Sequence, residues 1–371
     1  MSNTVGHTVE DAAAHTAPRP SAAKRRTAFA LSGALAAAVV AFPFQSASAA
    51  PAGDDSCVLE ELPMPEGLYF SLVTGMSTDG SVIAYRAYPA GLEGDERYPY
   101  LYRDGEMVPV PIPGLDQNVT DVNSEGLAVG VSYVDDVMLP YVFRDGEVTE
   151  LAVNDGGAAT GVNEAGDIVG IGGQYPRVPI VWRDGEVKPQ TLPLPDNASE
   201  GFANAIDEDG TIVGAYVDSE TGNARPYVWH PDGTGEELAI PEGFDPATAI
   251  LSTSGVAEEW VVGNLLTPDT EAAVRWNLED GTVEVLDLVY APAINEEGTA
   301  VGQDLNAVDA AYQEEDEKAA ALPGLSDPAD NWFGDIATEI DEDGELLAGQ
   351  VYAGEDETGA HILKAVVWDC D

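Results

Sequence analysis

A unit of alternating apolar and polar positions recurs along the chain and predicts its secondary structure. Each unit has a turn of the form Asn/Asp/Ser-x-x-Gly, and an apolar residue stands directly before the polar one. The polar side chain can bond back to the turn backbone and glycine permits positive φ, so this pattern predicts a tight turn between two strands. Successive turn glycines are 46, 40, 44, 45, 43 and 46 residues apart. They are Gly80, Gly126, Gly166, Gly210, Gly255, Gly298 and Gly344.

The rest of each unit predicts three more strand segments. The strand after the turn ends in Val-Gly or a close relative, and such a small residue indicates a close backbone approach or a large neighbour. The next strand carries one aromatic residue, and an Asp-Gly pair, the strongest short hairpin signal, follows in most units. The last strand ends in an apolar residue such as Leu192. The seven aromatic residues are Tyr102, Phe143, Trp182, Trp229, Trp276, Tyr312 and Trp368.

Four short strands in each of seven units predict an all-β fold, a seven-bladed β-propeller with four-stranded antiparallel blades. A β-solenoid would need a shorter period. A β-sandwich would not repeat one aromatic residue and one Asp-Gly turn seven times.

The repeat resembles the HAF repeat, an extracellular repeat of secreted bacterial proteins. The clearest copy is Ala-Thr-Gly-Val-Asn-Glu-Ala-Gly-Asp-Ile-Val-Gly at 159–170, followed by Trp-Arg-Asp-Gly at 182–185. The resemblance covers about residues 70–369 and implies a secreted β-rich repeat protein, with no established catalytic motif to carry over. Two units depart from the pattern. Unit five has an insertion between Gly255 and Val262, and unit six has Asp316 and Glu317 in place of Asp-Gly.

The two ends of the repeat region predict how the ring closes. Unit seven stops after its third strand, and Cys370 stands where the hairpin glycine belongs. The missing strand has a candidate at the other end of the chain, beginning at Cys57. We therefore expect this N-terminal strand to complete the last blade and a Cys57–Cys370 disulfide to replace the hairpin, since an open ring would expose sheet edges.

Residues 1–49 have the features of a signal peptide. Lys24, Arg25 and Arg26 precede an uncharged apolar run from Ala28 to Phe42, and an Ala-Ser-Ala sequence at 47–49 predicts cleavage after residue 49. The run is short for a membrane span, although a retained anchor is the alternative. Residues 50–371 are then a single secreted propeller domain, expected to be a monomer, and a Gram-positive bacterial exoprotein is the favoured source.

The predicted mature chain is strongly acidic. It has 11 basic and 65 acidic residues, for a net charge of −54. Such a surface repels polyanions, which argues against nucleic acid and against an anionic membrane as partners after signal cleavage. A solvated acidic coat is the simpler explanation, and carboxylates that hold divalent cations or a basic partner are the alternative.

The longer connections are expected at one face of the propeller and suggest a binding site there. These connect the second strand to the third and the fourth strand to the next unit, and they are less regular than the Asp-Gly hairpins. Trp332 and Phe333, together with Tyr98 and Tyr175, are the ligand-binding candidates because exposed aromatic rings stack on sugars or on a partner's side chains. Folding of the Trp332–Phe333 pair over the core is the alternative.

Evidence for catalysis or a bound metal is weak. The mature chain has only two histidines, His230 and His361, and contains neither a Gly-x-Ser-x-Gly elbow nor a His-Glu-x-x-His motif. Acidic turns such as Asp207–Gly210 resemble fragments of calcium loops but lack the twelve-residue ligand spacing, so turn formation is the simpler role and Ca²⁺ stays open.

The sequence therefore predicts no catalytic residue and no metal-binding residue. It predicts a secreted, non-catalytic binding module for an extracellular glycan or protein. One alternative is a carbohydrate-active hydrolase or lyase that uses channel carboxylates. A second alternative is a structural or cation-binding exoprotein.

Overall fold

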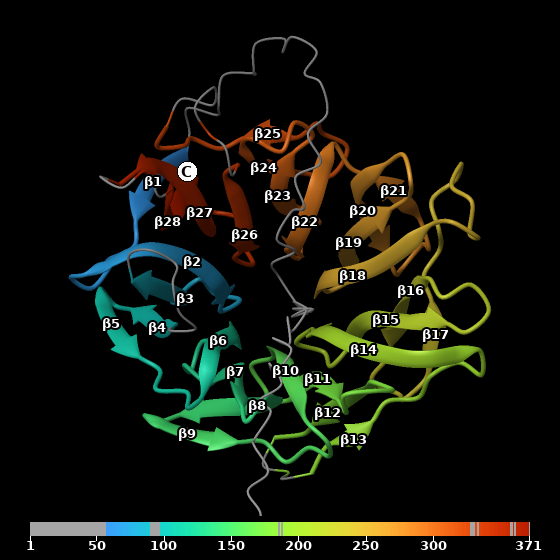
Figure 1. The fold of residues 1–371 in the computed structure, drawn as a ribbon. Helices are drawn as coiled ribbons and strands as arrows, with labels where there is room; N and C mark the ends of the chain where they lie inside the picture. Colours follow the sequence, from blue (N-terminus) through green and yellow to red (C-terminus); the bar gives the residue numbers. More distant parts are fainter. Residues whose placement is uncertain are drawn as a thin grey trace, which may run out of the picture.

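The chain forms seven four-stranded antiparallel sheets arranged as a ring, a seven-bladed β-propeller (Figure 1). The computed structural model describes residues 57–89, 97–184, 186, 188–326, 331, 334–356, 359 and 361–370. The predicted signal peptide, residues 1–49, lies outside these residues. Each innermost strand contacts the innermost strands of both neighbouring blades, so the ring is continuous.

In blades 1 to 6, the four strands follow one another in sequence from the innermost strand outward. Blade 1 is β2 (Leu68–Met76), β3 (Val82–Pro89), β4 (Tyr98–Arg103) and β5 (Glu106–Pro109); blade 2 is β6 (Leu115–Val122), β7 (Ala128–Val134), β8 (Val137–Arg144) and β9 (Glu147–Glu150); blade 3 is β10 (Gly157–Val162), β11 (Ile168–Gly172), β12 (Val178–Trp182) and β13 (Gln190–Thr191).

The second half of the ring repeats this arrangement, and only blade 7 takes a strand from the other end of the chain. Blade 4 is β14 (Ala198–Ile206), β15 (Ile212–Asp218), β16 (Ala224–Trp229) and β17 (Gly235–Glu237); blade 5 is β18 (Ile250–Ala257), β19 (Trp260–Leu266), β20 (Glu271–Asn277) and β21 (Val283–Val285); blade 6 is β22 (Leu288–Ile294), β23 (Ala300–Asp304), β24 (Ala310–Gln313) and β25 (Ala320–Ala321); blade 7 is β26 (Ile336–Ile340), β27 (Leu346–Glu355), β28 (His361–Cys370) and β1 (Cys57–Glu61).

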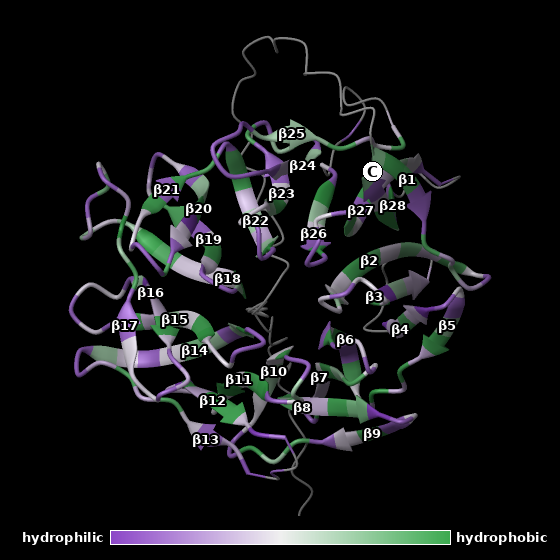
Figure 2. Cartoon of the chain, turned by 180° about the vertical axis from the view of Figure 1, so that it is seen from behind, coloured by the Kyte–Doolittle hydropathy of each residue, from purple (hydrophilic) through white to green (hydrophobic). Residues whose placement is uncertain are grey.

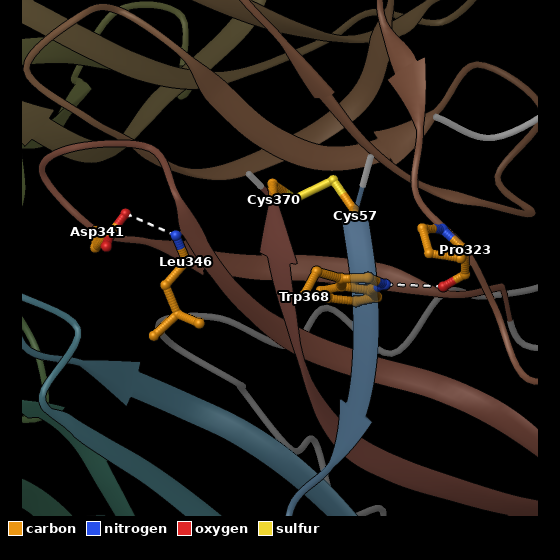
Figure 3. Close-up of a disulfide and its surroundings, with 6 residues drawn as sticks. All are labelled: Cys57, Pro323, Asp341, Leu346, Trp368 and Cys370. Carbon is orange, nitrogen blue, oxygen red and sulfur yellow. Dashed lines mark hydrogen bonds between the residues drawn. A yellow bond between two sulfur atoms is a disulfide. The ribbon is translucent and has the colours of Figure 1, made fainter. Parts of the chain in front are cut away.

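The ring closes as the sequence predicts. Strand β1 pairs with β28 from Cys57 opposite Cys370 to Glu61 opposite Val366. The two cysteines form a disulfide that joins residues 313 positions apart, at the end of blade 7 where the other blades have a hairpin (Figure 3). The N-terminal strand is therefore the outermost strand of the last blade.

A bulge in the innermost strand of every blade explains the small residue of the predicted Val-Gly pair, which lies inside the second strand and not at its end, since each second strand continues beyond it. The pairing register shifts within the first hairpin of all seven blades, for example between Ala159 and Gly161 in blade 3. A Cβ on Gly170 would overlap the carbonyl oxygen of Ala158. Close backbone approach is thus the reason for glycine here, and it recurs at Gly130, Gly214, Gly263, Gly302 and Gly349.

Four of the predicted aromatic residues are buried tryptophans, and each one bonds its blade to the segment that leads into that blade. Each indole N–H donates to a carbonyl of the connection from the preceding blade, because the buried nitrogen needs a partner. The pairs are Trp182 with Ala152 (3.0 Å), Trp229 with Pro193 (2.6 Å), Trp276 with Ala239 (2.7 Å) and Trp368 with Pro323 (2.8 Å), the last shown in Figure 3.

The hydrophobic core lies between blades rather than in one central cluster. One cluster joins Val213 and Val228 of blade 4 to Leu251, Val261 and Val274 of blade 5, and others join further neighbouring blades in the same way. Many hydrophobic residues lie in the strands, while many peripheral connections are hydrophilic (Figure 2). Each blade thus buries apolar side chains against its neighbours.

The position predicted for the turn of unit five is wrong. Gly255 lies inside β18, at the bulge, and the true turn runs from Ala257 to Trp260. Glu258 takes the positive φ of 49° at this turn. Since Ser252 and Gly255 have the spacing of the other turns by chance, the pattern matched a segment five residues too early, and no insertion follows Gly255.

Candidate functional site

The two faces of the ring are built from different connections. The long-loop face is the set of blade ends where the second strand connects to the third and the fourth connects to the next blade. The short-turn face is the opposite set of ends, with the turns between first and second strands and the hairpins between third and fourth strands. This division follows from the antiparallel order of every blade.

The structure places two of the four predicted ligand-binding residues at the long-loop face. Tyr98 is the first residue of β4 and is 40% exposed, and Tyr175 lies in the connection between β11 and β12 and is 83% exposed. They belong to blades 1 and 3, so blade 2 separates them. Trp332 and Phe333 lie outside the described residues.

Exposed large apolar residues gather at the long-loop face. Of the eleven such residues in the described part of the chain, eight lie at this end of the blades and three lie on outermost strands. None lies in a turn of the short-turn face. The eight are Tyr69, Tyr98, Leu115, Tyr175, Ile250, Leu266, Leu305 and Leu325, and the three are Val58, Val108 and Val285.

Two arginine-centred clusters shape the long-loop face, one between blades 1 and 2 and one between blades 3 and 4. The guanidinium of Arg97 lies 4.4 Å from the ring centre of buried Tyr88, and its Nε is 3.3 Å from the Asp116 carboxylate. Arg86 lies on the same tyrosine ring, 5.4 Å from its centre. Burial raises the pKa of Tyr88, while both arginines oppose that rise. These groups hold the start of blade 2 against blade 1.

The second cluster lies beside Tyr175. Arg177 makes two hydrogen bonds of 2.9 Å to the carboxylate of Glu200, and its guanidinium covers the ring of Phe202 at 4.3 Å. These hydrogen bonds lower the pKa of Glu200. A bidentate pair of this kind fixes both side chains, so Tyr175 projects from a connection whose far end is anchored.

The short-turn face is tied together by hydrogen bonds that join a turn of one blade to a turn, or in one case to strand β20, of another blade, which we call the turn girdle. Asn163 is typical: its Oδ1 accepts from Asp167 N–H within the turn, and its Nδ2 donates to the Asp207 carbonyl of the next blade. The links between blades are Asn123–Asn163, Ser124–Glu164, Asn163–Asp207, Glu164–Glu208, Asp207–Glu258, Arg275–Gly298, Asn295–Glu342, Glu342–Thr78 and Thr78–Glu208.

One link of the girdle crosses the ring. Thr78 Oγ1 of blade 1 lies 3.3 Å from Glu208 Oε1 of blade 4, although these blades are not neighbours. The other oxygen of Glu208 accepts from Glu164 N–H at 2.9 Å. Side chains therefore span the axis at this end of the ring.

Two carboxylates lie on innermost strands where other blades have glycine or alanine. The residue after the bulge is Asp121 in blade 2 and Glu339 in blade 7, whereas it is Gly75, Gly161, Ala205, Gly255 or Ala293 elsewhere. Burial raises the pKa of Asp121 to about 7, against the effect of N–H donation from Val122 and Val162. Burial and the charge of Asp121 raise the pKa of Glu339 well above its usual value.

Sequence reasoning missed both this pair and the girdle. The pair could have been found by aligning the seven units, because an acidic residue stands in two of them at a position where the other five have glycine or alanine. The girdle has a signal too, since an acidic residue often follows the turn's polar residue, as at Glu164, Glu208, Glu296 and Glu342.

The described residues contain no group of three or more histidine, cysteine or acidic side chains arranged to hold a metal ion. A calcium site stays a prediction without a location. His230 lies 3.3 Å from Glu236, and His361 lies 3.2 Å from the Tyr352 hydroxyl. Within the described part of the chain there is no helix with the length and hydropathy to span a membrane.

Comparisons with solved structures show the same fold in proteins of different activities. The chain is similar to virginiamycin B lyase from Staphylococcus aureus, with a TM-score of 0.56 and 15% identity over 84% of this chain and 99% of that one. It is also similar to U3-55K, with a TM-score of 0.53 and 12% identity over 86% and 100% of the two chains. At these identities the likeness shows the fold alone.

A third solved structure, a prolyl endopeptidase, matches with a TM-score of 0.50 and 12% identity, over 85% of this chain and 47% of that one. No family model matches the sequence, and no curated protein matches it. Only this chain's own residues therefore indicate what it does.

Proposed function

We propose that the protein is a non-catalytic binding module that engages an extracellular ligand, a glycan or a protein, through its long-loop face. The observation that carries the proposal is the distribution of exposed large apolar side chains: eight of eleven lie on this face and none lies in the opposite turns. Apolar surface costs free energy in water, and rings such as Tyr98 and Tyr175 offer large contact areas at low entropic cost.

The alternative is a carbohydrate-active hydrolase or lyase, and Asp121 with Glu339 is the observation that favours it. Glycosidases use a pair of carboxylates, of which the general acid has a raised pKa. However, each oxygen of Asp121 accepts a backbone N–H, from Val122 and from Val162, both at 2.8 Å. A carboxylate held in this way supports the fold, so binding is the better-supported function.

Export is part of the proposal. Disulfides persist in oxidising compartments, and the Cys57–Cys370 bridge is consistent with a secreted chain. We expect removal of residues 1–49, so N-terminal sequencing of the exported protein is expected to begin at Ala50. Membership of the HAF-repeat family stays a prediction in the same way.

The test is a binding screen of the protein against arrays of glycans and of extracellular proteins. A ligand found in this way is expected to lose at least tenfold in affinity for the double variant Tyr98→Ser/Tyr175→Ser. The matched control, Val108→Ser/Val285→Ser, removes two exposed apolar side chains from outermost strands and is expected to change affinity less than twofold. Failure of every array member to bind, or equal losses in both variants, would contradict the proposal.

A further inference from the structure

One exposed apolar patch on the long-loop face is continuous, fully described and next to acidic groups. Ile250 of β18 lies directly opposite Leu266 of β19, which in turn lies directly opposite Glu271 of β20. Directly opposed side chains of antiparallel strands point to the same side of a sheet, about 5 Å apart. The three side chains therefore form a row at the end of blade 5, two apolar and one acidic.

This row is open to solvent. Ile250 is 38% exposed and Leu266 is 47% exposed, and Glu271 is also exposed. The residues one position further into the blade, Leu251 and Leu265, are completely buried against blade 4. Because successive residues of a strand point to opposite sides of the sheet, Leu251 and Leu265 hold this end of blade 5 against blade 4, while the row points to the other side and is partly exposed.

The segments beside the row are held in place by hydrogen bonds. The buried guanidinium of Arg225 donates to the carbonyls of Ala249 and Pro246, so blade 4 fixes the segment that leads into Ile250. At the other side, Thr267 Oγ1 accepts from Thr270 N–H at 2.9 Å and closes the turn after Leu266. The surface is pre-ordered, which reduces the entropic cost of binding.

The exposed charges beside the row are negative, since the neighbouring guanidinium of Arg225 is buried. Asp269 and Glu271 are exposed, and Asp245 lies one backbone turn before Ala249, whose N–H donates to the Asp245 carbonyl. None of these three carboxylates lies within 4 Å of a described Lys, Arg or His nitrogen. A ligand with a positive charge would therefore gain attraction here that the chain itself does not supply.

We propose that this surface, the blade-5 shelf of Asp245, Ile250, Leu266, Asp269 and Glu271, binds a basic segment of a partner protein in which an apolar side chain stands beside Lys or Arg. The apolar side chain contacts Ile250 and Leu266, and the cation lies among the three carboxylates. An uncharged glycan would leave these carboxylates uncompensated. This inference rests on the proposed binding function and narrows its ligand to a cationic protein.

The test measures binding of a fluorescent 12-residue peptide made of four Lys-Leu-Gly units, at about 0.15 M salt, where exposed charges more than about 8 Å apart are largely screened. Replacement of the peptide's leucines by serine, or of its lysines by glutamate, is expected to weaken binding at least tenfold. Cellohexaose, an uncharged glycan, is the comparison ligand and is expected not to compete.

Two pairs of protein variants separate the shelf from general attraction to an acidic protein. Leu266→Ser is expected to weaken peptide binding about tenfold and Glu271→Gln about threefold, since an apolar contact contributes more than an exposed ion pair. Val285→Ser, on the outermost strand of the same blade, and Glu279→Gln, in its hairpin on the other face, are the matched controls and are expected to change affinity less than twofold. A melting curve of each variant confirms folding.

Three outcomes would overturn the inference. They are no peptide binding, equal losses for Glu271→Gln and Glu279→Gln, and cellohexaose binding that depends on Leu266. A ligand whose binding depends on Tyr98 and Tyr175 but not on Leu266 or Glu271 would leave the proposed function standing and remove the shelf alone.

Discussion

The short-turn face and the long-loop face use their polar side chains in opposite ways. At the short-turn face, Asn163 and its equivalents bond both within their own turn and to the next blade, so most polar atoms have structural partners. At the long-loop face, Asp269 and Glu271 have no ion pair in the described chain, and apolar side chains stand in solvent. The short-turn face therefore repeats one kind of contact between blades, while the long-loop face has separate arginine clusters and leaves other groups available to a ligand.

This difference follows from the geometry of the ring. Tight turns of neighbouring blades converge near the axis, where a short side chain reaches the next turn, as Asn123 reaches the Asn163 carbonyl at 3.1 Å. The longer connections at the other end vary in length and sequence, so no single contact can repeat there. Substitutions at the two faces should accordingly affect different properties, stability at one and binding at the other.

The largest effect is expected from the disulfide, which lies at the short-turn face. In Cys57→Ser/Cys370→Ser, the chain-entropy model gives a loss of up to about 6 kcal/mol, because the closed loop includes nearly the whole propeller, and residual structure in the unfolded chain reduces this value. Chemical denaturation of the variant and of the parent under non-reducing conditions measures the loss. An unchanged midpoint would show that the strand pairing of β1 with β28 suffices for closure.

The second prediction concerns pH. The pKa of Asp121 is about 7 in the folded chain, above its ordinary value of 3.8, so the folded chain binds more protons than the unfolded chain between these values. Stability should therefore rise as the pH falls from 8 to 5, by up to about 3 kcal/mol from this group at ~1.4 kcal/mol per pH unit. The contribution is absent above pH 7 and complete below pH 4.

Asp121→Asn should flatten this rise, because the amide does not titrate. Loss of net charge alone also stabilises an acidic protein, so the control is Asp145→Asn, an exposed hairpin residue that keeps its turn conformation and removes the same charge. Denaturation midpoints from pH 5 to pH 8 give the slopes. Equal slopes for the two variants would mean that Asp121 is not the titrating group.

Asn163→Ala tests the girdle itself and should cost about 2 kcal/mol. The side chain is only 2% exposed, and its removal breaks two hydrogen bonds worth about 1 kcal/mol each while leaving a buried N–H and a carbonyl without partners. Denaturant unfolding measures the change. A loss below about 0.5 kcal/mol would show that water or a neighbouring turn replaces these bonds.

The propeller ring could be predicted from the sequence, but the contacts between its turns could not. The fold, the closing strand and the disulfide depend on a period and on two cysteines, and both are visible along the chain. The Asn163–Asp207 bond joins residues of adjacent turns 44 positions apart, and only the diameter of the finished ring brings them together. Local pattern also failed at Gly255, because the register of β18 with β19, not the spacing from Ser252, decides where that turn falls.

The candidate site could likewise be predicted only in part. The long-loop face follows from connection length, and Tyr98 and Tyr175 are on it with substantial exposure. The blade-5 shelf was not predictable, because exposure of Ile250 and Leu266 depends on how far blade 6 covers the end of blade 5. The identity of an apolar residue in a strand does not show whether the neighbouring blade covers it.

The smallest effect on stability is expected from Tyr175→Ala at the long-loop face. Its ring is 83% exposed, so truncation removes little buried surface and should change the free energy of unfolding by less than about 0.5 kcal/mol. The same unfolding experiment that shows a loss for Asn163→Ala should therefore leave this variant on the parent curve. If Tyr175→Ala instead costs as much as Asn163→Ala, the ring packs on its neighbours in solution, and the division between a structural face and a free face no longer holds.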